Sequence, residues 1–129
     1  MIGTTRNIKV FARAEPTDLR AGYDALFALA RDVLEQDPLS GHAFLFVSRN
    51  RKRCKVLVYD GTGLVIFTKR LETSTQFAAP WKHSRGDAIE MTMSELALFV
   101  EGSKAVWRTS LSPSAAFPAP VRSSPTSAV

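Results

Sequence analysis

The sequence predicts an α+β domain in which one long amphipathic helix covers a face of a mainly antiparallel sheet. Three observations predict it: an apolar stripe at helical spacing early in the chain, three short runs of β-branched and aromatic residues after it, and turn residues between those runs. The 129 residues suit one domain, and a hydrophobic content of 45% with 22% charged residues is ordinary for a globular protein.

The first two expected elements are a strand over residues 6–13 and a helix over residues 18–36. Apolar and polar side chains alternate through the first segment, which is typical of a strand, and Pro16 stops it. Thr17 and Asp18 supply a helix start, with a capping oxygen and an acid in the first turn. Apolar residues then form a single helical stripe between positions 19 and 34. Pro38 and Gly41 indicate a turn over residues 37–41.

Three strands are expected next, over residues 42–47, 55–59 and 64–68, the last running on through Lys69 and Arg70. Each run is apolar on both faces, and Asp60-Gly61 between the second and third is a strong hairpin signal. The sequence therefore predicts an antiparallel meander. The aromatic residues of these strands are expected in the core: Phe44, Phe46, Tyr59 and Phe67.

The remaining chain predicts a long loop over residues 72–87, a short strand over residues 88–91 and a short final helix. Thr92 and Glu95 form a capping box at the start of that helix, and Gly102 is placed to end it. Residues 1–108 are expected to form the single domain. Residues 109–129 are rich in serine and proline and nearly uncharged, so we expect a disordered tail there.

The positive charge of the chain is local. Lys and Arg number 17 against 12 Asp and Glu, a net charge of +5, and the excess equals the basic residues of segment 49–55. Such a compact charge attracts a polyanion, whereas the plainer alternative is a solvated hairpin tip that only keeps the protein soluble. The candidate DNA-binding residues are this segment and the end of the following strand: Arg49, Arg51, Lys52, Arg53, Lys55, Lys69 and Arg70.

No catalytic pattern stands out in the sequence. The acids are scattered over turns and the helix surface, two histidines and one cysteine do not make a zinc site, and we expect neither a metal nor another cofactor. Cys54, between Arg53 and Lys55, is expected to have a depressed pKa. No apolar run approaches the ~20 residues that cross a bilayer. No secretory signal is visible either, so the sequence predicts a cytoplasmic protein without a membrane partner.

Several motifs in one order resemble a known family. They are Pro-Thr-Asp-Leu-Arg at 16–20, Gly-Tyr-Asp-Ala-Leu at 22–26, Asp-Pro-Leu-Ser-Gly at 37–41, the basic segment, Lys-Arg-Leu-Glu at 69–72 and Met-Ser-Glu-Leu at 93–96. Over about residues 8–108 the chain resembles the small TnpB (second open reading frame) accessory protein of the IS-sixty-six group of bacterial insertion sequences. It departs from that pattern after Glu72 and in its tail. The resemblance implies a role in DNA transposition beside a separate, larger transposase.

Three hypotheses follow. The first is a non-enzymatic accessory that binds DNA through the basic residues without sequence preference. The second is an assembly factor that docks the larger transposase or a second copy of itself. Its candidate anchors are Trp81, Trp107 and Phe77, although these aromatics could equally cap the sheet. The third and weakest is a metal-dependent nuclease component that contributes acids near Asp60.

Overall fold

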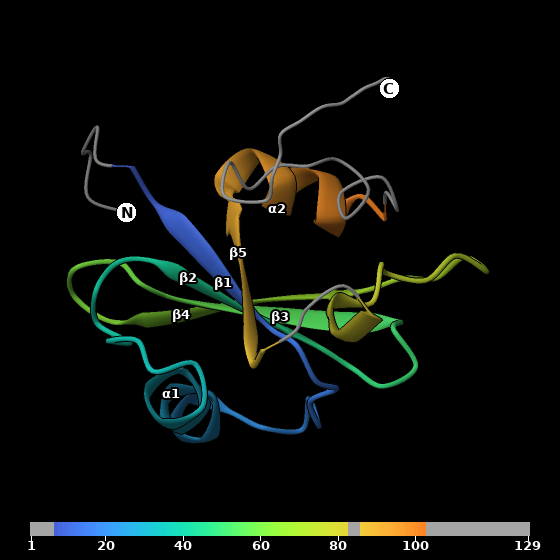
Figure 1. Ribbon diagram of the computed structural model, residues 1–129. Helices are drawn as coiled ribbons and strands as arrows, with labels where there is room; N and C mark the ends of the chain where they lie inside the picture. Colours follow the sequence, from blue (N-terminus) through green and yellow to red (C-terminus); the bar gives the residue numbers. More distant parts are fainter. Residues whose placement is uncertain (1–6, 83–85, 103–129) are drawn as a thin grey trace.

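A five-stranded sheet forms the centre of the molecule (Figure 1). The computed structural model describes residues 7–82 and 86–102. The strands lie in the order β4-β3-β2-β1-β5. Their bounds are Lys9–Arg13 for β1, Ala43–Val47 for β2, Arg53–Tyr59 for β3, Leu64–Arg70 for β4 and Ala88–Thr92 for β5.

Strand direction follows from the connections. Strands β1 and β2 are parallel, because a crossover that contains helix α1 (Tyr23–Asp32) joins them. The pairs β2–β3, β3–β4 and β1–β5 are antiparallel, so the predicted α+β fold with a mainly antiparallel sheet is confirmed. The meander and the strand expected over residues 88–91 are confirmed as well.

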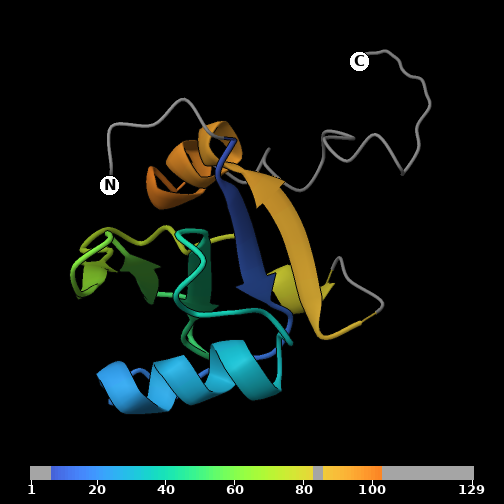
Figure 2. The ribbon, with the colours of Figure 1, turned by 90° about the vertical axis from the view of Figure 1, so that its left-hand side faces the viewer.

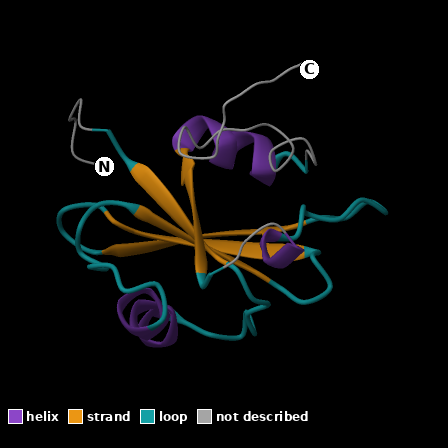
Figure 3. Ribbon diagram, in the orientation of Figure 1, coloured by secondary structure: helices purple, strands orange, loops and turns teal. Residues whose placement is uncertain are grey.

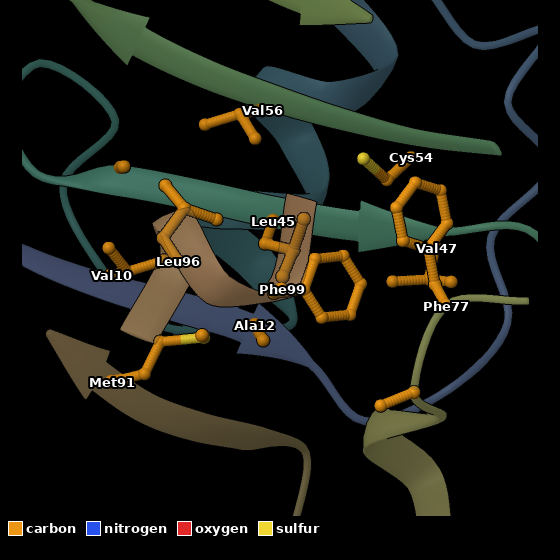
Figure 4. Packing of buried hydrophobic residues seen from close by; sticks show 12 residues of the cluster. Val10, Ala12, Leu45, Val47, Cys54, Val56, Phe77, Met91, Leu96 and Phe99 are labelled. Carbon is orange, nitrogen blue, oxygen red and sulfur yellow. The ribbon is translucent and has the colours of Figure 1, made fainter. Parts of the chain in front are cut away.

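The two helices cover opposite faces of the sheet (Figures 2 and 3). On one face, Leu26 and Ala30 of α1 pack against Phe44 and Leu57 of the sheet. On the other, helix α2 (Met93–Val100) packs over a second core cluster, shown in Figure 4. A short 3₁₀ helix, η1 (Pro80–Lys82), lies beside β1. None of the helices in the described parts of the chain is long and apolar enough to cross a bilayer.

Both ends of α2 match the sequence prediction. The hydroxyl of Thr92 accepts a hydrogen bond from the Glu95 amide, and the Glu95 carboxylate accepts one from the Thr92 amide, which completes the capping box. At the other end, Gly102 has a φ of 88°, and its amide donates to the carbonyl oxygen of Phe99 at 2.9 Å. Glycine permits this left-handed turn without strain.

The predicted start of α1 was wrong. The helix begins at Tyr23 with Gly22 as its N-cap, so residues 17–21 lie outside it. Asp18 lies outside the helix, and its carboxylate accepts bonds from the amide and guanidinium of Arg20 two residues later. Of the predicted stripe, Leu26 and Ala30 are buried as expected, whereas Tyr23 is 51% exposed. The helix ends at Asp32, four residues before the expected end at position 36.

The expectation that Phe67 lies in the core was wrong. Strand β4 is one of the two edge strands of the sheet, and its Val65 and Phe67 are 46% and 48% exposed. Phe44 and Phe46, on the central strand β2, are fully buried as expected. Tyr59 is half-buried, and its hydroxyl donates to the carbonyl oxygen of Gly61 at 2.9 Å. Strand composition does not reveal that β4 is an edge strand, where Phe67 stays exposed.

The predicted tail of residues 109–129 lies outside the described residues, as does Trp107.

Candidate nucleic-acid interface

The basic segment begins as a tight turn between β2 and β3. The amide of Ser48 donates to the carbonyl oxygen of Arg53 at 3.0 Å, and the amide of Arg51 donates to the carbonyl oxygen of Ser48 at the same distance. Arg51 has a φ of 59°, in the left-handed region. The side-chain oxygen of Asn50 accepts bonds from the Ser48 hydroxyl at 2.8 Å and from the Lys52 amide at 3.0 Å. The turn therefore has a defined shape that local hydrogen bonds hold.

Two of its cations hold the loop that follows β4. The Nζ atom of Lys52 donates to the carbonyl oxygens of Thr73 and Thr75, each at 2.6 Å. The guanidinium of Arg51 donates to the side-chain oxygen of Gln76 at 3.1 Å. The backbone joins these same segments, because the Phe77 amide donates to the carbonyl oxygen of Arg51 at 2.7 Å. These two side chains are thus tied to protein oxygens.

Lys55 and Lys69 hold other parts of the fold. The Nζ atom of Lys55 donates to the carbonyl oxygen of Ala21, just before α1, at 2.9 Å. The Nζ atom of Lys69 donates to the carbonyl oxygen of Val100, at the last turn of α2, at 2.6 Å. A cation at that position satisfies a free carbonyl and also complements the helix dipole.

The other three candidates are exposed arginines: Arg49, Arg53 and Arg70. Arg53 and Arg70 face each other across β3 and β4. Like charges directly opposite are unfavourable, and Glu72 offsets this one through a 2.8 Å ion pair with Arg70. Within residues 7–82 and 86–102, neither Arg49 nor Arg53 forms an ion pair with an acid.

A groove beside the turn brings a second segment to these arginines. It has a volume of about 720 Å³, and its lining includes Thr17, Asp18 and Arg20 on one side and Arg49, Asn50 and Arg53 on the other. In Figure 1 the connection from β1 to α1 and the β2–β3 turn both lie below the right-hand end of the sheet. No local sequence pattern pairs segments 30 residues apart, and by sequence alone residues 17 and 18 indicate a helix start.

The predicted depression of the Cys54 pKa was wrong. The thiol lies in the core cluster beneath α2, with no exposed surface (Figure 4). Burial disfavours the thiolate and raises the pKa of Cys54 to about 12, against a smaller opposing effect of Lys69. The flanking Arg53 and Lys55 point to the other face of β3, because successive side chains alternate along a strand.

The candidate partner-binding aromatics occupy different environments. Phe77 has no exposed surface, and its ring stacks on that of Phe99 with centroids 4.9 Å apart (Figure 4). Trp81, in η1, is half-buried and packs against the same cluster. In the free protein, therefore, only Trp81 of these two offers surface to a partner.

The carboxylate of Asp60 is occupied by its own turn. It accepts bonds from the amides of Thr62 and Gly63, both at 2.9 Å, and from the Thr62 hydroxyl at 3.0 Å. These bonds stabilise the charged form and lower the pKa of Asp60. In the described part of the chain, no group of three or more His, Cys, Asp or Glu side chains is placed to hold a metal ion.

Comparison with known proteins assigns the chain to a family. Residues 8–109 match the family model described as IS66 Orf2 like protein. Two proteins of Sinorhizobium fredii (strain NBRC 101917 / NGR234), the uncharacterized proteins y4jC and y4hO, are each 32% identical over 102 residues. That alignment covers 79% of this chain and 85% or 86% of the relative. No solved structure gives a significant match. The chain belongs to the IS66 Orf2-like family, which points to an accessory role in transposition.

Proposed function

We propose that this protein is a non-catalytic transposition accessory that binds DNA through the positively charged β2–β3 turn and the adjoining ends of β3 and β4. One observation carries the proposal: Arg49 and Arg53 are both exposed and line one groove, and neither has an acidic partner in the described residues. Unpaired exposed guanidinium groups are good phosphate ligands, because they present several donors in a planar fork.

The seven basic residues have two roles in this proposal. Arg49, Arg53 and Arg70 contact phosphates, and the ion pair with Glu72 weakens the contribution of Arg70. The four cations bonded to protein oxygens hold neighbouring segments of the fold and still add to the positive field of the site: Arg51, Lys52, Lys55 and Lys69. Phosphate contacts carry no sequence information, so binding is sequence-independent.

A double substitution, Arg49→Ala with Arg53→Ala, tests the proposal. Binding to a random-sequence DNA duplex is measured by fluorescence anisotropy at several salt concentrations. The slope of log affinity against log salt should become shallower by about 1.8, which corresponds to two phosphates at about 0.9 each.

The matched control is Lys9→Ala with Arg31→Ala. It removes the same charge from β1 and α1, at side chains that already pair with Glu90 and Asp32. This variant should bind like the parent. If the two variants lost the same DNA affinity, only net charge would matter, and the β2–β3 turn would not be the DNA-binding site.

The second candidate function is assembly with the larger transposase or with another copy of this chain. Apolar surface favours it: Phe67 is exposed on the edge strand β4, and Trp81 is only partly buried. Exposed aromatics and unpaired strand edges are common anchors for partners. Co-purification with the transposase, and the mass in solution, should both depend on Trp81→Ala or Phe67→Ser if this function is present.

A further inference from the structure

We infer that the loop of residues 16–20 is the second wall of the DNA site, and that Asp18 restrains binding by holding Arg20 away from the phosphates. The inference rests on the proposed DNA binding and deepens it. It assigns a binding role to Arg20 and an opposing, regulatory role to Asp18. The observation behind it is the groove that Asp18 and Arg20 share with Arg49 and Arg53.

The loop is held firmly against the basic turn. The amide of Thr17 donates to the carbonyl oxygen of Val47, at the end of β2, at 2.8 Å. The hydroxyl of Thr17 accepts a 3.3 Å bond from the guanidinium of Arg13, and Thr17 is only 5% exposed. Lys55 holds the far end of the loop through the Ala21 carbonyl oxygen. Both walls of the groove are therefore fixed before any ligand arrives.

Asp18 occupies the guanidinium of Arg20. The Nη2 atom of Arg20 lies 2.6 Å from one carboxylate oxygen, and its Nε atom lies 3.0 Å from the other. The Arg20 side chain is 89% exposed, so this pair is open to solvent and to competing anions. The Arg20 bonds hold the pKa of Asp18 at about 2, and the carboxylate remains charged at neutral pH.

The lining of the groove fits a phosphodiester backbone. It contains three arginines, together with the hydroxyl side chains of Thr17 and Ser48 and the amide of Asn50. No aromatic ring is among the described residues that line the groove, so these residues offer no platform on which bases stack. A phosphate in the groove competes with Asp18 for the guanidinium of Arg20, because both anions accept the same paired bonds.

Asp18→Asn tests this inference directly. The substitution removes the negative charge and keeps a side-chain oxygen. That oxygen can still accept the bond that the Arg20 amide donates to Asp18 Oδ1 at 3.0 Å in the parent. We expect the affinity for a random-sequence duplex to rise about two- to fivefold, the scale of one exposed charge interaction. The salt slope should steepen by about 0.9, because Arg20 then neutralises one more phosphate.

Asp32→Asn is the matched control. Asp32 also pairs with a neighbouring arginine, Arg31, through two exposed bonds, but it lies on α1 outside the groove. The Asp32→Asn variant changes the net charge by the same amount as Asp18→Asn, and it should leave the DNA affinity and the salt slope unchanged. The double variant Asp18→Asn with Arg20→Ala should lose the extra slope. Circular dichroism confirms that each variant is folded.

The outcomes separate this inference from the proposed function. If the parent does not bind DNA, both are overturned. If the parent binds and Arg49→Ala with Arg53→Ala weakens it, but Asp18→Asn does not strengthen it, only the role of the loop is overturned. Equal gains from Asp18→Asn and Asp32→Asn would overturn it too. An extra slope that persists without Arg20 would contradict the competition for its guanidinium.

Discussion

The Nζ atom of Lys52 lies 2.6 Å from the carbonyl oxygen of Thr73, so one cation of the basic turn forms a hydrogen bond within the fold. A second bond of equal length reaches Thr75, and together they hold the loop after β4. Arg53, the next residue along, has an exposed side chain with no such role. Neighbouring basic residues in this turn therefore differ in function, and substitutions can separate them.

We expect Lys52→Met to destabilise the fold and Arg53→Met to leave it almost unchanged. Loss of two bonds to a charged donor should lower the free energy of unfolding by about 1 kcal/mol, whereas the surface change should stay within about 0.5 kcal/mol. Urea denaturation measures both. Hydrogen exchange at the Phe77 amide, which donates to the Arg51 carbonyl oxygen, should quicken only in Lys52→Met. Equal stability of the two variants would contradict the assigned role of Lys52.

The Asp18–Arg20 pair predicts an unusually acidic carboxyl group. NMR titration should give a midpoint of about 2 for Asp18, lowered from 3.8 chiefly by the Arg20 side-chain bond. Because the pKa is lowered in the folded state, the pair stabilises the protein above pH 3.8, and this contribution is lost as the pH falls through 2. In Arg20→Ala the midpoint should return toward 3.8, while Arg31→Ala should leave it in place. An unchanged Asp18 midpoint in Arg20→Ala would refute the pairing.

Much of the fold could be predicted because the signals are local. The meander depends on short β-branched and aromatic runs separated by turn residues, and the capping box of α2 spans only Thr92 to Glu95. The start of α1 could not be predicted in this way. Asp18 is a good N-cap residue by type, but the helix begins only at Tyr23 with Gly22 as its N-cap, and the Asp18 carboxylate accepts bonds from Arg20 outside the helix.

Only part of the candidate site could be predicted from the sequence, because the rest depends on contacts between distant segments. The basic residues of the turn are adjacent in the chain, and their excess charge could be counted. Arg20 joins Arg49 and Arg53 through long-range contacts, among them the bond from Thr17 to Val47. Which cations are tied to carbonyl oxygens also depends on tertiary packing, as Lys69 and Val100 show. Composition alone gives every lysine and arginine the same weight.

Cys54 should behave as an inert thiol at neutral pH. Burial raises its pKa from 9.0 to about 12, so the folded protein should react with iodoacetamide far more slowly than the urea-unfolded chain. Above pH 9 the unfolded chain loses the thiol proton and the folded chain keeps it, so stability should fall between pH 9 and 12. Urea denaturation of Cys54→Ala over the same pH range gives the pH dependence of stability that comes from the other titrating groups. Identical pH dependence in parent and variant would contradict the buried, protonated thiol.

Phe77 and Phe67 provide a matched test of the core. Phe77 has no exposed surface and stacks on Phe99, whereas Phe67 is 48% exposed on the edge strand. We expect Phe77→Ala to lower the free energy of unfolding by about 3–5 kcal/mol, and Phe67→Ala by less than about 1 kcal/mol. Urea denaturation compares them, and Phe77→Leu gives a milder variant if Phe77→Ala does not fold. Similar costs at both positions would mean that Phe67 is covered in solution, and a concentration-dependent mass would then identify self-association as the cause.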